Sequence, residues 1–87
     1  MKITLDIPDY DGNGLEIIWN NDAKYDLTTI ADAVVLKANK EALVCFAKQM
    51  LYFAHNNIPN GSHIHYSSFF TGEDQKNELI LELDQKN

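Results

Sequence analysis

Hydrophobic and polar residues alternate at the start of the chain. Residues 1–7 carry apolar side chains at positions 3, 5 and 7, and residues 15–20 carry them at positions 15, 17 and 19. A period of two is typical of a strand with one buried face. Pro8 and a segment rich in Asp, Asn and Gly separate the two runs. We therefore expect two strands joined by a long hairpin connection.

The pattern in residues 23–38 fits two structures. Leu27, Ile30 and Val34 fall at helical spacing, whereas Val34 and Leu36 alternate as in a strand. The β-branched pair Val34 and Val35 favours a strand, since such side chains pack well on a pleated surface. The sequence therefore predicts a strand over residues 32–38, with a helix over 23–38 as the alternative.

The next segment has the pattern of an amphipathic helix. Asn39 is a suitable N-cap, and Glu41 would lie in the first turn, where the helix dipole favours a carboxylate. The residues expected to face the core recur at spacings of three and four: Leu43, Phe46, Ala47, Met50, Leu51 and Ala54. We expect Gln49 and Tyr52 largely on the opposite, polar side. Pro59 predicts the end of the helix, because the residue before a proline disfavours helical backbone.

Two further strands are expected after the helix. The first covers residues 62–67, with His63 and His65 on one face and Ile64 and Tyr66 on the other. Residues 71–77 are polar and predict a loop. The second strand covers residues 78–84, with leucines at 79, 81 and 83 facing inward and acidic residues facing outward.

These elements follow one another in the order β-β-β-α-β-β. They predict an α+β fold in a single domain, residues 1–87, in which one amphipathic helix packs on one face of a mostly antiparallel sheet. A single helix cannot cover both faces of such a sheet. We therefore expect Ile18, Val35 and Ile80 to be left on the open face, which predicts either a homodimer or a surface for a partner.

The charge of the chain limits its partners. Its 87 residues include seven lysines, no arginine and 13 acidic residues, which gives a net charge of −6. A negative field repels phosphate backbones, so nucleic-acid binding is not expected, and a basic protein is the kind of partner that the field would attract. No apolar run is long enough to cross a bilayer, and the first residues do not resemble a signal peptide, so we expect a cytoplasmic protein without membrane contact.

Candidate chemistry is sparse. Two histidines at the spacing of His63 and His65 can chelate a metal, and His55 could supply a third ligand from the end of the helix. The sequence contains no tight cluster of ligands such as His-x-x-x-His, however. The segment from Asp9 to Asn13 is similar to the start of a calcium loop, yet the twelfth position is Asn20 instead of Glu. Cys45 is the only cysteine, so an intramolecular disulfide is excluded, and we expect it to be buried. The sequence predicts no enzyme, no cofactor and no metal, although a metal or small-ligand module centred on the two histidines remains the alternative.

The most suggestive surface begins at the strand that carries the histidines. Adjacent aromatic residues beside acidic ones suit the recognition of a basic protein, because a few aromatic and charged anchors supply most of the binding energy of an interface. The residues predicted to bind a partner are His63, His65, Tyr66, Phe69, Phe70, Glu73 and Asp74.

Several segments together resemble a known family. They are the helix start at residues 38–43, the helix positions Ala47, Leu51 and Ala54, the run from Ile58 to Tyr66, and the apolar strand at residues 78–82. Over about residues 33–84 the chain is similar to small bacterial α+β proteins identified as immunity proteins of polymorphic toxin systems. The resemblance implies that the chain binds and neutralises a cognate toxin, and it implies no catalytic residues.

Overall fold

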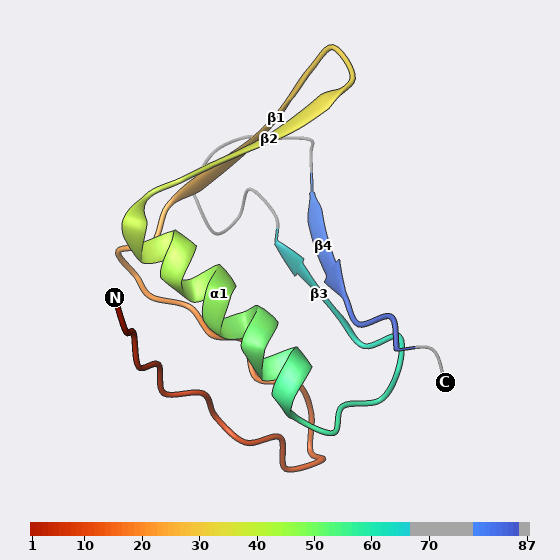
Figure 1. The fold of residues 1–87 in the computed structure, drawn as a ribbon. Coiled ribbons are helices and arrows are strands. Elements are labelled where there is room, and N and C mark those ends of the chain that lie inside the picture. The colour runs from red at the N-terminus through yellow and green to blue at the C-terminus, as the bar shows by residue number, and fades with distance from the viewer. Residues whose placement is uncertain (67–77, 86–87) are drawn as a thin grey trace.

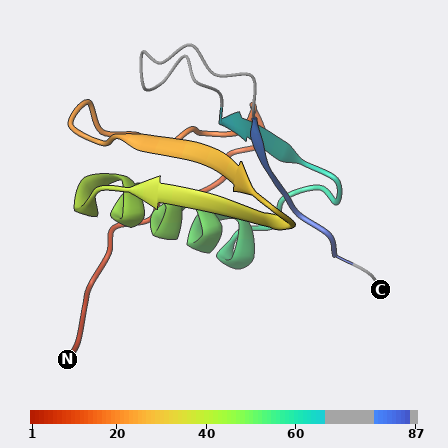
Figure 2. The same cartoon turned by 90° about the horizontal axis from the view of Figure 1, so that it is seen from above.

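The computed structural model describes residues 1–66 and 78–85. Within these residues the chain forms the elements β1 (Tyr25–Ile30), β2 (Ala33–Ala38), α1 (Lys40–His55), β3 (His63–Tyr66) and β4 (Leu79–Glu82). β1 pairs with β2 and β3 pairs with β4, each as a separate antiparallel two-stranded sheet (Figure 1). The view from above shows α1 along one side of the fold, with both hairpins on the same side of the helix (Figure 2).

The expected fold class is confirmed, but the expected sheet is not. The fold is α+β with one helix, whereas the described strands follow the order β-β-α-β-β and form two sheets instead of one. The predicted strands at residues 1–7 and 15–20 are wrong, since neither segment pairs with a strand. β1 was not expected as a strand, and the helical alternative for residues 23–38 is also wrong. The strand expected at residues 32–38 is present as β2.

The N-terminal segment is attached to the helix through side chains. Gln49 accepts a hydrogen bond from the backbone N–H of Ile18 and donates one to the carbonyl of Glu16. The hydroxyl of Tyr52 accepts from the N–H of Glu16 at 3.1 Å. Near the C-terminal end of α1, Asn56 accepts from the N–H of Tyr10. The alternating pattern of residues 15–20 thus belongs to a half-buried segment whose backbone partner is a helix face, which explains why no strand forms there.

The β1–β2 hairpin closes through a two-residue connection. Ile30 pairs with Ala33, and Ala31 between them has a φ of +53°. Two-residue hairpin turns need positive φ and usually contain Asn or Gly, neither of which occurs at this turn. The absence of that signal is why the sequence did not predict β1.

The helix α1 begins where the sequence predicts, directly after Asn39. The side chain of Asn39 caps the helix by accepting from the N–H of Ala42 at 2.9 Å. The same oxygen accepts from the N–H of Lys24, and the side-chain amide donates to the carbonyl of Asp22. Asn39 therefore joins the first turn of α1 to the chain that leads into β1.

The helix buries a different face from the one that the sequence predicts. Its buried residues are Ala42, Cys45, Phe46, Gln49, Tyr52 and Phe53. Leu43 and Met50, expected in the core, are 54% and 52% exposed. Gln49 and Tyr52 can be buried because their polar atoms bind the backbone of the N-terminal segment, which removes the cost of burying them. Cys45 is buried, as expected.

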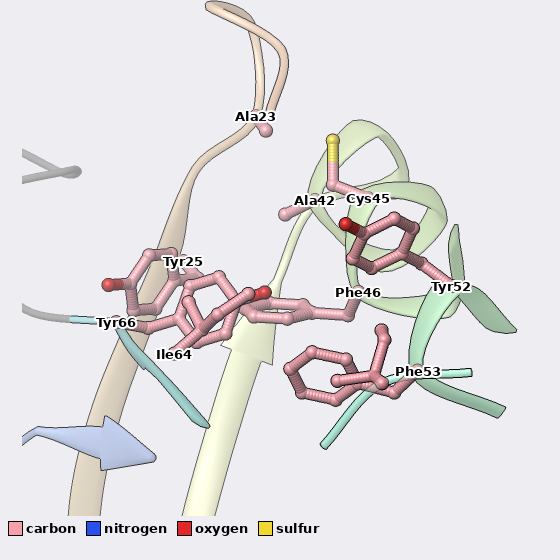
Figure 3. Packing of buried hydrophobic residues seen from close by; sticks show 10 residues of the cluster. Ala23, Tyr25, Ala42, Cys45, Phe46, Tyr52, Phe53, Ile64 and Tyr66 are labelled. Atoms are coloured by element: carbon pink, nitrogen blue, oxygen red, sulfur yellow. The ribbon is translucent and has the colours of Figure 1, made fainter. Parts of the chain in front are cut away.

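Four aromatic rings join the separate parts of the fold. Trp19 from the N-terminal segment, Tyr25 from β1, Phe46 from α1 and Tyr66 from β3 contact one another, with every pair of ring centroids between 4.9 and 6.3 Å apart. Figure 3 shows Phe46 reaching from the helix to Tyr25 and Tyr66. Most of these pairs are edge-to-face, an arrangement that stabilises the fold beyond the burial of apolar area.

Candidate partner-binding surface

The outer face of the β3–β4 hairpin brings two of the predicted site residues together. His63 and His65 both point outward, and their rings lie 5.0 Å apart between centroids. On β4, Glu82 stands directly opposite His63 and Ile80 directly opposite His65. The alternation in the sequence predicts this arrangement of the histidines, and the structure confirms it.

Each histidine contacts an oxygen acceptor. Nδ1 of His65 contacts a carboxylate oxygen of Glu78, just before β4, and both side chains remain nearly half exposed. Nδ1 of His63 lies 3.1 Å from the carbonyl oxygen of Gly61, which can only accept. These contacts engage Nδ1 of each ring. The two imidazoles and the Glu78 carboxylate remain on the surface of the hairpin.

An exposed isoleucine lies among these polar groups. Ile80 is 50% exposed, as expected for the open face, and is flanked on its own side of β4 by Glu78 and Glu82. An apolar centre with a polar margin is the usual composition of a protein-binding surface. We call this set, consisting of His63, His65, Glu78, Ile80 and Glu82, the hairpin face.

The other two residues expected on an open face are less exposed than Ile80, since Ile18 packs against the core and Val35 is half-buried.

Tyr66 does not belong to the hairpin face. Its side chain is 1% exposed and lies in the aromatic cluster, so the expectation that it binds a partner is corrected. The reason is the register of β3, in which Ile64 and Tyr66 point inward while the histidines point outward. Burial raises the pKa of Tyr66 to about 12, and the neighbouring Cys45 and Tyr25 add to the increase.

Four other residues predicted to bind a partner lie outside the described residues. They are Phe69, Phe70, Glu73 and Asp74. Among residues 1–66 and 78–85, no group of three or more His, Cys, Asp or Glu side chains is arranged to hold a metal ion. In the segment that is similar to a calcium loop, Asp11 accepts from the backbone N–H of Asn13, which is the geometry of a turn.

The comparison with protein families assigns the chain to a family. A family model described as immunity protein 32 matches residues 33–84, more than half of the sequence. The chain belongs to the immunity protein 32 family. No curated protein and no solved structure matches it. In the described parts of the chain, no helix is both long and apolar enough to cross a membrane.

The family match covers only some of the elements. It begins at β2, includes α1, β3 and β4, and therefore contains every residue of the hairpin face. The N-terminal segment and β1 precede it. The resemblance stated from the sequence alone covers the same residues, and the family assignment confirms it.

Proposed function

We propose that this chain is an immunity protein that neutralises a cognate toxin by binding it, without catalysis. The observation that carries the proposal is membership of the immunity protein 32 family. A net charge of −6 without any arginine suits a basic toxin domain, because opposite charge raises the rate of association.

We place the toxin contact on the hairpin face. Ile80 offers exposed apolar area at its centre, and Glu78 and Glu82 offer negative charge at its margin. His63 and His65 add two polar side chains that reach out from β3. The sequence also places Phe69, Phe70, Glu73 and Asp74 between the two strands of this hairpin, so we keep them in the proposed contact.

The gene neighbourhood of this chain is where a cognate toxin is to be sought, and the direct test is binding to the toxin domain found there. Isothermal titration of the purified pair and growth of cells that co-express both proteins measure binding and protection. We expect tight binding and restored growth with the wild type. Absence of both with a folded chain contradicts the proposal.

Two isoleucine-to-alanine substitutions test where the toxin contact lies. Ile80→Ala removes the apolar centre of the hairpin face and is expected to weaken binding at least about tenfold. Ile30→Ala is the matched control, since Ile30 is 61% exposed in the other hairpin. If Ile30→Ala weakens binding and Ile80→Ala does not, the toxin contacts a different surface.

Charge reversal tests the contribution of the acidic margin. Glu82→Lys is expected to slow association with a basic toxin and to reduce the dependence of the association rate on salt. Stopped-flow mixing at low and high salt measures both effects. An unchanged association rate would show that this margin does not attract the toxin.

A further inference from the structure

The outward side of α1 carries an apolar stripe in a position where most helices carry polar residues. Leu43, Ala47, Met50 and Ala54 are all exposed, at successive spacings of four, three and four. That spacing is the repeat of a helix that packs along a second helix. The other side of α1 is already occupied by the core, so the helix is apolar on two sides.

The order of side-chain sizes along the stripe makes it complementary to itself. Residues 47 and 50 have their midpoint at position 48.5, and so do residues 43 and 54. If a second copy packs antiparallel about a two-fold axis at that midpoint, Leu43 meets Ala54 of the other copy and Met50 meets Ala47. Each large side chain then faces a small one, in both halves of the contact at once.

A lysine in the first turn fits the same arrangement. Lys40 is exposed two turns before Ala47, at the N-terminal end of α1, where the dipole of its own helix disfavours a positive charge. In the antiparallel pair it lies at the level of residue 57 of the second copy, just beyond the C-terminal end of that helix at His55. The dipole of the second helix favours a cation at that position.

From these features we infer that the chain forms a homodimer through antiparallel packing of α1 against α1 of a second copy. The stripe runs over 12 residues, from Leu43 to Ala54, which is about 17 Å of helix. A contact of this length is small, so the dimer dissociates on dilution into the micromolar range. The stripe is separate in sequence from the hairpin face, and the inference does not depend on the proposed toxin contact.

Sedimentation equilibrium of the intact chain over a range of concentrations measures the assembly. We expect the mass to rise from 9.9 kDa towards twice that value. Ala47→Glu places a charge in the contact and is expected to keep the chain monomeric. A chain that stays monomeric at every concentration overturns the inference, and so does a dimer that Ala47→Glu leaves intact.

An exchange of two residues tests the antiparallel register. Ala47→Met places two large side chains opposite each other and Met50→Ala leaves two small ones, so each alone is expected to weaken the dimer about tenfold. The double variant restores one large and one small residue at each contact, and is expected to recover the wild-type dissociation constant. A double variant that is no better than either single variant overturns the antiparallel pairing.

Two controls separate this inference from the toxin contact. All four stripe positions are exposed, so thermal melting is expected to show every variant folded. Ile80→Ala, on the hairpin face, is expected to leave the dimer unchanged. If stripe variants of a monomeric chain weaken toxin binding while Ile80→Ala does not, the stripe belongs to the toxin contact and the dimer inference fails.

Discussion

The side-chain amide of Gln49 accepts a hydrogen bond from the backbone N–H of Ile18 at 2.8 Å. Its nitrogen donates to the carbonyl of Glu16 at 3.0 Å, so one side chain satisfies a donor and an acceptor that a neighbouring strand would otherwise satisfy. Gln49 is completely buried by this arrangement. The helix thereby takes the place of a partner strand for the N-terminal segment.

Gln49→Leu is expected to destabilise the protein more than an apolar core substitution of similar volume. It leaves the N–H of Ile18 and the carbonyl of Glu16 without their partner at a part-buried site, which costs about 3 kcal/mol. Urea denaturation measures the loss. Gln85→Leu is the matched control, because Gln85 is exposed and its change is expected within about 0.5 kcal/mol. Equal stability of the two variants would show that water replaces the lost bonds.

The failure of the strand prediction at residues 15–20 has the same cause. Alternation shows that a segment is half-buried with a period of two, but it carries no information about what pairs with the backbone. The partner here is a set of side chains on α1, more than 30 residues away for both Gln49 and Tyr52. Asn39 and the alternation from His63 to Tyr66 were predictable, because a helix cap and strand faces depend on neighbouring residues alone.

The orientation of α1 could not be derived from apolar spacing, because two faces of the helix are apolar. The choice between them depends on Gln49 and Tyr52, whose polar groups find partners only in the folded chain.

For the candidate binding surface, the same alternation that places His63 and His65 outward also places Tyr66 inward. The aromatic character of Tyr66 therefore indicated a core residue as much as a binding residue.

A pair of helix substitutions tests the rotation of α1. Phe46→Ala removes a ring that contacts Trp19, Tyr25 and Tyr66, and is expected to cost about 3–5 kcal/mol. Leu43→Ala, at an exposed position of the same helix, is expected to cost less than about 1 kcal/mol. Thermal melting at a concentration low enough to keep the chain monomeric compares the two. A loss at Leu43 as large as that at Phe46 would place Leu43 in the core.

The turn of the first hairpin offers a stabilising substitution. Ala31 has a φ of +53°, a conformation in which an alanine is strained and a glycine is not. Ala31→Gly is expected to raise stability by about 1 kcal/mol, which corresponds to a rise in Tm of about 4–8 °C in a domain of this size. Ala33→Gly, in β2 beside the turn, is the control and is expected to lower Tm, because glycine weakens a strand. If both variants are destabilised, the turn does not hold residue 31 at positive φ.

The buried tyrosines predict how stability depends on pH. Burial raises the pKa of Tyr25 to about 12, with a further increase from the charge of Glu78, and burial raises the pKa of Tyr66 to the same range. In the unfolded chain a tyrosine has a pKa of about 10, so folding favours the protonated phenol. This contribution to stability is complete below pH 10 and is lost as the pH rises towards 12, on the order of 2 kcal/mol for each tyrosine.

Urea denaturation at several values of pH between 9 and 12 measures this loss. The free energy of unfolding of the wild type is expected to fall steadily above pH 10. Tyr25→Phe removes one of the two titrating groups and is expected to reduce the slope to about half, whatever its effect on stability at neutral pH. Tyr25→Phe combined with Tyr66→Phe is expected to remove most of the remaining slope. Because only slopes are compared, a double variant that keeps the wild-type slope would show that other groups cause the alkaline unfolding.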